Sequence, residues 1–137
     1  MSISTITAAR KQRTITLTGR SPVKIYEDEW PVIARATGDS YGGMDPQRHD
    51  QAESRGEIDT HLLVVRRHAD GRAIVYGVID AADAAWGQPA GGTDWRGGVL
   101  LSAGAELAEA IRRVGDDGDL PDSVIRECIA DLPAEQI

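Results

Sequence analysis

The sequence predicts a single α+β domain in which an antiparallel sheet carries helices on one face. Two segments with strand-like patterns are each interrupted by turn residues, and the last third of the chain has apolar residues at helical spacing. A chain of 137 residues is long enough to bury one core without disulfides or a structural metal. We expect residues 1–12 to form a flexible basic arm and residues 13–137 to form the domain, with about four strands arranged as two hairpins.

The first hairpin is expected between about residues 14 and 26. In the segment RTITLTG, threonines alternate with Ile15 and Leu17, which is typical of a half-buried strand. The segment GRSP then supplies turn residues, and Val23 and Ile25 resume the alternation.

A short helix is expected at residues 27–38, between the two hairpins. The acidic residues 27–29 suit the positive end of its dipole, and Pro31 is tolerated in a first turn. Gly38 provides a stop. The same pattern predicts that Trp30 lies in the core.

The segment HLLVVRRHADGRAIVYGVID predicts the second hairpin, because two apolar runs are joined by Asp70 and Gly71, a pair that suits a type I′ turn. Pairing across that turn places Arg67 opposite Ile74. Apolar residues occur on both faces of these strands, which predicts a central position in a sheet. Helices are expected to cover one face, and a loop or a second chain the other, so a homodimer is one expectation.

Residues 81–98 contain many glycines and predict an irregular connection. An amphipathic helix is expected to follow, from Val99 or Ser102 to Val114, with Ser102 as its N-cap and Gly115 as its stop.

The last helix is expected to open at Pro121 and Asp122 and to end before Pro133. Its apolar stripe consists of Val124, Ile125, Cys128, Ile129 and Leu132.

The net charge of −7 is unevenly distributed along the chain. Residues 1–26 carry five cations and no carboxylate, so the remaining residues carry a net charge of −12. An acidic body favours basic partners, whereas a basic arm can contact either phosphate or the acidic face of its own neighbour.

No apolar run approaches the roughly 20 residues that a bilayer requires. The N-terminus lacks the apolar block of a secretory signal. The single cysteine, Cys128, cannot form an internal disulfide, which agrees with a reducing compartment. We therefore expect a cytoplasmic protein that does not bind membranes.

The three histidines do not have the spacing of a metal site. His49, His61 and His68 are separated by 11 and 6 residues, unlike the close pairs that hold one metal ion. Residues 116–127 lack the oxygens and the glycine of a calcium loop, and GQPAGGT lacks the lysine of a phosphate loop. We expect no enzyme activity, no cofactor and no metal. An enzyme with a site around His49 and His61 is the alternative, and it predicts a bound metal ion.

The segments EWPVIARA, RRHADGRAIVYGVID and IRECIADLPAEQI resemble a group of small proteins that are encoded on bacterial plasmids, integrative elements and phage-like islands. The resemblance covers the two hairpins and the last helix. The group has no established activity, so the resemblance implies a mobile-element context and assigns no site residues.

Taken together, these observations predict a non-enzymatic acidic binding protein that contacts a host or element-encoded protein with a basic surface. One form of this hypothesis is an inhibitor of host defence, similar to anti-CRISPR proteins or nucleic-acid mimics. The predicted acidic patch consists of Glu106, Glu109, Asp116, Asp117, Asp119 and Asp122.

The alternative is an accessory protein that contacts DNA during element maintenance or transfer. Its phosphate-binding residues are expected to be Arg10, Lys11, Arg13, Arg66, Arg67 and Arg72.

Overall fold

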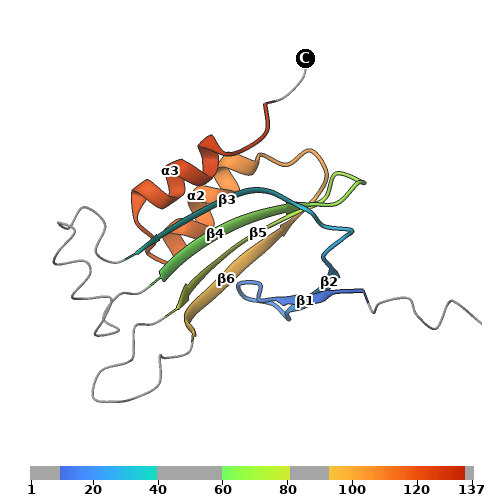
Figure 1. Cartoon of the computed structure of the whole chain (residues 1–137), viewed down its shortest axis with the longest axis horizontal. Helices are drawn as coiled ribbons and strands as arrows, with labels where there is room; N and C mark the ends of the chain where they lie inside the picture. Colours follow the sequence, from blue (N-terminus) through green and yellow to red (C-terminus); the bar gives the residue numbers. More distant parts are fainter. Residues whose placement is uncertain (1–9, 40–59, 81–92, 135–137) are drawn as a thin grey trace, which may run out of the picture.

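Four antiparallel strands form the central sheet in the order β3-β4-β5-β6. The computed structural model describes residues 10–39, 60–80 and 93–134. The strands of this sheet are β3 (Val32–Asp39), β4 (Thr60–Arg67), β5 (Ala73–Asp80) and β6 (Thr93–Leu101). The helices α2 (Leu107–Asp117) and α3 (Asp122–Ala130) cover one face of the sheet, and a separate hairpin of β1 (Gln12–Ile15) and β2 (Val23–Tyr26) lies on the opposite side (Figure 1). The α+β prediction is therefore confirmed, with two helices on one face.

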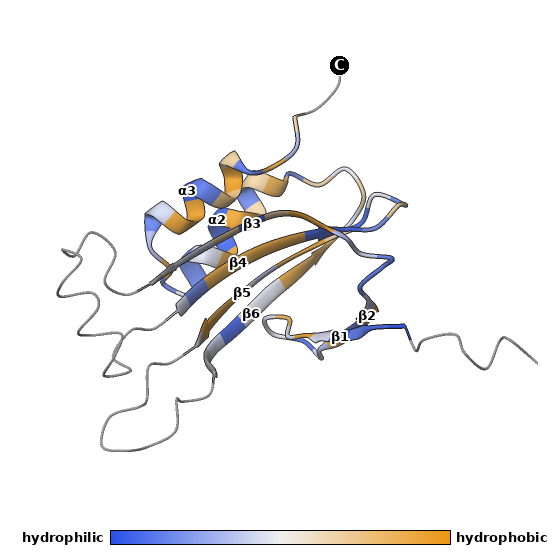
Figure 2. Ribbon diagram, in the orientation of Figure 1, coloured by the Kyte–Doolittle hydropathy of each residue, from blue (hydrophilic) through white to orange (hydrophobic). Residues whose placement is uncertain are grey.

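The sheet is apolar on both faces, and each face has its own core. Side chains alternate along a strand, so Leu63 and Val65 face the helices while Val64 faces the hairpin. Figure 2 shows the apolar residues along β4 and β5 and on the helices that cover them. The helix-side core also includes Val75, Ile111, Val114, Val124 and Cys128, and the hairpin-side core includes Ile15, Leu17, Ile25, Ile74 and Tyr76. The first hairpin thus covers the face on which the sequence analysis expected a loop or a second chain.

The first hairpin is present as predicted, with Ile15 paired to Val23. It does not continue the main sheet. The backbone N–H of Thr18 donates to the carbonyl oxygen of Gly98 at 2.8 Å, and the N–H of Gly98 donates to the Thr18 hydroxyl at 3.1 Å. A Cβ at Gly98 would lie only 3.0 Å from the Thr16 carbonyl oxygen of the hairpin, so the close approach of the hairpin to β6 favours glycine at this position.

The helix expected at residues 27–38 does not form, and this prediction is wrong. Residues 27–30 form a turn in which the N–H of Trp30 donates to the Glu27 carbonyl at 3.3 Å, and β3 follows at Val32. Pro31 disfavours the helical conformation at the preceding residue, and the β-branched Val32 and Ile33 suit a strand. Trp30 is nevertheless buried, at 7% exposure, so its place in the core was predicted correctly.

The second hairpin is confirmed, but its register differs by one residue from the prediction. Arg67 pairs with Ala73, whereas Ile74 was its predicted partner. The N–H of Gly71 donates to the His68 carbonyl at 2.9 Å, and the N–H of His68 donates to the Arg72 carbonyl at 2.9 Å. Gly71 has a φ of 94° and is the position of the turn that needs a left-handed residue. A three-residue loop of this kind replaces the two-residue type I′ turn and moves the pairing by one position.

The irregular connection expected at residues 81–98 is contradicted over its last part, because β6 begins at Thr93 and pairs with β5. Gly77 of β5 and Gly97 of β6 make space for the side chain of Trp95. A Cβ at Gly77 would lie 2.9 Å from the Trp95 ring, and one at Gly97 would lie 2.5 Å from it. Gly118, at the end of α2, also makes space for the Trp95 ring, because a Cβ there would lie 2.5 Å from it.

The start of α2 also differs from the prediction. The helix begins at Leu107 after the cap position Glu106, which makes no side-chain capping bond, so Ser102 is not its N-cap. Gly115 lies within the helix, which continues to Asp117. The last helix does begin at Asp122 behind Pro121, and Val124, Ile125 and Cys128 are buried as predicted. Among the described residues, no helix is long and apolar enough to span a membrane.

Gly115→Ala tests the close packing of α2 on α3. Alanine normally stabilises a helix interior by up to about 1 kcal/mol relative to glycine. Here a Cβ would collide with Ile125, so we expect the substitution to destabilise the protein by about 1–3 kcal/mol in urea unfolding. Ser123→Ala, at an exposed helix position, is the control and should change stability by less than about 0.5 kcal/mol. A more stable Gly115→Ala variant would contradict the packing described for the two helices.

Candidate functional site

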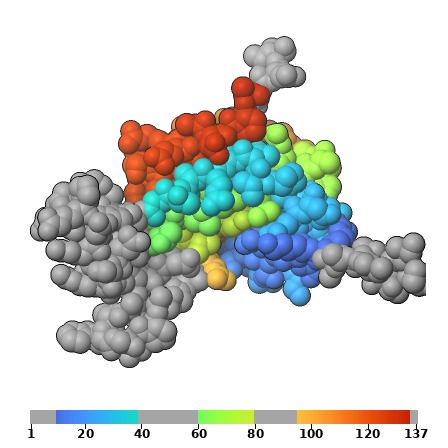
Figure 3. Space-filling model, viewed as in Figure 1, coloured from blue at the N-terminus to red at the C-terminus, as the bar shows by residue number. Residues whose placement is uncertain are grey.

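The two helices and their connection, residues 106–131, form an acidic layer, which we call the helix layer. It contains eight carboxylates and three arginines, all of them exposed. In the space-filling view, the helix layer and the β1–β2 hairpin lie on opposite sides of β3 (Figure 3).

The six residues of the predicted acidic patch are all in this layer, but they lie in two groups. Glu106 and Glu109 are at the N-terminal end of α2, whereas the other four are near its C-terminal end and the start of α3. Asp116 lies ten positions after Glu106, which corresponds to roughly 15 Å along the helix axis. Asp116 and Asp122 line one hollow of about 370 Å³, whose floor includes Ile125 and which Arg112, Arg126, Ile129 and Ala130 complete.

Few carboxylates of the helix layer have a partner. Asp122 pairs with Arg126 at 3.0 Å, and both side chains are exposed, so this pair contributes at most about 1 kcal/mol. The Asp131 carboxylate accepts the backbone N–H of Arg35 at 2.9 Å and so occupies a donor on the free edge of β3. Within the described ranges, no ion pair is formed by Glu106, Glu109, Asp116, Asp117, Asp119 or Glu127.

The basic residues of the arm are bound to the acidic turn after β2. Arg10 contacts Asp28 at 3.0 Å and Glu29 at 3.2 Å. Arg13 pairs with Glu27 at 2.5 Å and Lys11 lies 3.5 Å from the same carboxylate. These cations therefore have an intramolecular partner, the acidic face of a neighbouring segment.

Arg66 is a buried cation that contacts two residues of the hairpin-side core, Trp30 and Tyr76. Its side chain is 9% exposed. Its Nε donates to the Tyr76 hydroxyl at 2.9 Å, its Nη1 donates to the Trp30 carbonyl at 3.0 Å, and its Nη2 lies 3.6 Å from Glu27. A buried guanidinium needs such partners, so Arg66 connects the turn after β2 to the sheet.

Arg72 is also engaged, since its Nε donates to Asp70 at 2.8 Å and its guanidinium lies 5.1 Å from the centre of the Trp30 ring. Of the six predicted phosphate-binding residues, five are thus buried or paired. Arg67 makes no ion pair with any described residue.

These contacts also shift proton affinities. The hydrogen bond from Arg13 holds the pKa of Glu27 below its ordinary value, with smaller effects from Lys11 and Arg66. Arg10 lowers the pKa of Asp28 in the same way, and the pKa of Arg10 is raised in return.

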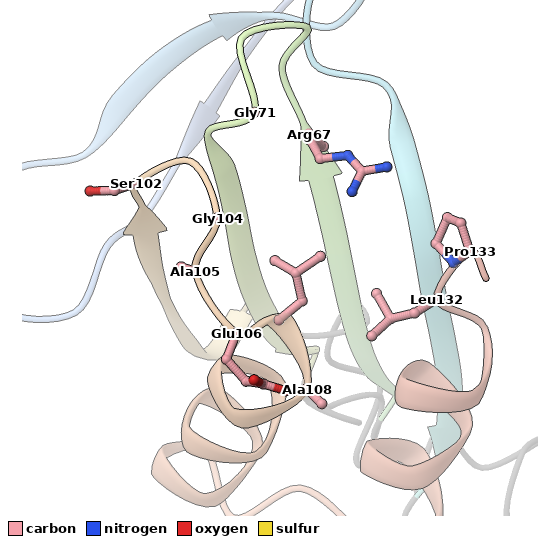
Figure 4. A pocket seen from close by; sticks show the side chains of 10 residues that line it. Arg67, Gly71, Ser102, Gly104, Ala105, Glu106, Ala108, Leu132 and Pro133 are labelled. Carbon is pink, nitrogen blue, oxygen red and sulfur yellow. The ribbon is translucent and has the colours of Figure 1, made fainter. Parts of the chain in front are cut away.

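Arg67 lines a cavity of about 270 Å³, the Arg67 cavity. It is bounded by the β4–β5 turn, the connection from β6 to α2 and the end of α3 (Figure 4). Leu107 and Leu132 provide apolar surface, and Glu106 lies at the end opposite to Arg67 (Figure 4). The remaining lining residues are Gly71, Ser102, Gly104, Ala105, Ala108 and Pro133.

The described histidines do not converge. His61 is 7% exposed at the start of β4, and its Nδ1 has no hydrogen-bond partner among the described residues. His68 lies just beyond the other end of the strand, where its ring centre is 5.0 Å from that of Trp30. His49 lies outside the described residues, so the alternative with a site around His49 and His61 stays a prediction. In the described part of the chain, no three His, Cys, Asp or Glu residues are grouped to hold a metal ion.

Cys128 belongs to α3, and its side chain is fully buried in the helix-side core. Burial raises the pKa of its thiol to about 11, with a smaller contribution from Asp131. A thiol that is protonated at neutral pH is a poor nucleophile.

Comparisons with protein-family models, with curated proteins and with solved structures found no match for this chain.

The sequence reasoning missed the acidic turn of residues 27–29 as the partner of the arm. The signal was present, because three consecutive carboxylates follow directly after the region that carries five cations. The signal was not used because these carboxylates were assigned to the N-terminus of the helix expected at residues 27–38.

Glu27→Gln tests the role of this turn through pH. Because the pKa of Glu27 is lowered in the folded state, the unfolded state binds more protons, and stability is lost as the pH falls below the ordinary value of 4.5. We expect Glu27→Gln to have a lower Tm at neutral pH and a smaller decrease in Tm between about pH 5 and pH 3. Glu127→Gln, which removes an exposed carboxylate without an ion pair, is the control. Equal pH dependence of Tm in wild type and Glu27→Gln would contradict the assignment.

Proposed function

We propose that the protein is a non-enzymatic binding protein that presents its helix layer to a partner protein with a basic surface. The observation that carries this proposal is the separation of charge between the two sides of the sheet. The helix layer has eight carboxylates against three arginines, whereas residues 10–30 have five cations against three carboxylates.

The availability of these carboxylates supports the same proposal. Six of the eight make no ion pair among the described residues, so their charges are available to the cations of a partner. The hollow between α2 and α3 adds an apolar floor to the charged surface. Charged surfaces of this kind accelerate encounter with partners of opposite charge and exclude partners of like charge.

The resemblance to small proteins of mobile elements supports a host protein or an element-encoded protein as the partner. Inhibition of a host defence, by occupation of a surface that binds nucleic acid, is the specific form that we propose.

The alternative, contact with DNA, has less support from the geometry. Arg10, Lys11 and Arg13 are bound to residues 27–29, and Arg66 is buried. A phosphate would have to displace these carboxylates, which lowers the gain from each contact. This alternative predicts retardation of labelled DNA that weakens steeply with salt and is lost when the arm is removed.

Affinity purification from lysate of a bacterial host, followed by mass spectrometry, tests the proposal. The helix-layer variant is Asp116→Asn with Asp117→Asn. The matched control is Thr14→Lys with Ser21→Lys, which changes the net charge by the same amount at exposed positions of the hairpin side. We expect the wild type and the control to retain the same partner, and the helix-layer variant to bind it at least about tenfold more weakly.

Equal capture by all three proteins, or the absence of any partner, would contradict the proposal. Loss of binding in the hairpin control alone would favour the basic side of the molecule instead.

A further inference from the structure

We propose that the Arg67 cavity binds a small ligand in which one carboxylate is attached to an apolar group. The cavity is separate from the hollow between α2 and α3, so this inference does not depend on the binding function proposed above.

Arg67 indicates that the ligand carries an anionic group. Its side chain is exposed and forms no ion pair with any described residue, although four other predicted basic-site residues, Arg10, Arg13, Arg66 and Arg72, are held by carboxylates or by the core. Figure 4 shows its guanidinium extending from β4 toward the side on which Pro133 lies. A guanidinium offers two parallel N–H donors to a carboxylate, which makes the contact directional as well as charged.

Two leucines, Leu107 and Leu132, indicate that the ligand also carries an apolar group. Both side chains are half-buried at the margin of the helix-side core, and in Figure 4 the Leu132 side chain lies below the Arg67 guanidinium. Each therefore presents apolar surface that a ligand could remove from water.

The charge and size of the ligand follow from the rest of the lining. Glu106 is the second charged residue of the cavity and lies at its far end (Figure 4), so one cation faces the anion and a further negative charge is repelled. This arrangement favours a monoanion, such as a carboxylate, over a dianionic phosphate. The volume of about 270 Å³ lies at the lower limit of ligand sites, which fits a ligand smaller than a typical drug.

The backbone around the cavity holds this shape. A Cβ at Gly71 would lie 3.0 Å from the Cβ of Ala103, so the β4–β5 turn is in direct contact with the connection that leads to α2. In that connection, Gly104 has a φ of 82° and the N–H of Ala105 donates to the Ser102 carbonyl at 3.2 Å. A preformed site requires little ordering on binding.

Titration of the full chain with octanoate, followed by backbone amide NMR, tests the inference. We expect saturable shifts around Arg67, Leu107 and Leu132. Octanol and octylamine, which lack the carboxylate, should bind at least about tenfold more weakly, and so should octyl phosphate if the monoanion assignment holds. A short peptide that ends in leucine with a free carboxylate, compared with its amide, distinguishes a free acid from a protein C-terminus as the source.

Arg67→Gln is the decisive variant. Its exposed position should leave the spectrum of the folded protein intact, and we expect octanoate to bind it at least about tenfold more weakly. Arg113→Gln, at an exposed position on α2 outside this cavity, should bind as the wild type does. Equal affinity for wild type and Arg67→Gln, tighter binding of octyl phosphate, or no saturable binding of either carboxylate probe would overturn the inference.

Discussion

The structure depends on the need to cover both faces of one apolar sheet. The central strands β4 and β5 place Leu63, Val65 and Val75 on the helix side and Val64 and Ile74 on the other. Each fully buried aliphatic side chain contributes about 1.5–3 kcal/mol, so neither face can be left in water without a large loss of stability. The helices α2 and α3 cover one face, and the β1–β2 hairpin must cover the second.

This requirement also determines where the charges lie. The hairpin brings its cations to the sheet, where the turn of residues 27–29 binds them and Arg66 joins that turn to Tyr76 and Trp30. The helices turn their apolar stripes inward and leave their carboxylates in water, mostly without an ion pair to any described residue. Arg10, Lys11, Arg13 and Arg66 are therefore paired within the molecule, whereas most carboxylates of the helix layer make no ion pair with a described residue and are available to a partner.

Much of the fold follows from patterns in the sequence, and the failures have local causes. Alternation predicts both hairpins, and the stripe that contains Cys128 predicts the last helix. The helix at residues 27–38 was wrong because its spacing was weighed above the effect of Pro31 on its neighbour. Strand β6 was missed because the glycines of residues 81–98 were taken as turn residues, whereas Gly97 makes room for the ring of Trp95 and Gly98 makes room for the backbone of Val75 and Thr16, which are distant in sequence. The residues of the predicted acidic patch lie in two groups, because the length of α2 separates Glu106 and Glu109 from Asp116 and the residues that follow it.

The most direct test of the two-sided core is urea unfolding of Ile15→Ala, followed by the far-ultraviolet circular dichroism of the helices. Ile15 is 2% exposed and belongs to the core on the face opposite to α2 and α3. If the sheet needs both covers, the helix signal should be lost in one transition whose free energy of unfolding is lower by about 2–4 kcal/mol. An unchanged helix transition, with the hairpin unfolding separately, would contradict the account.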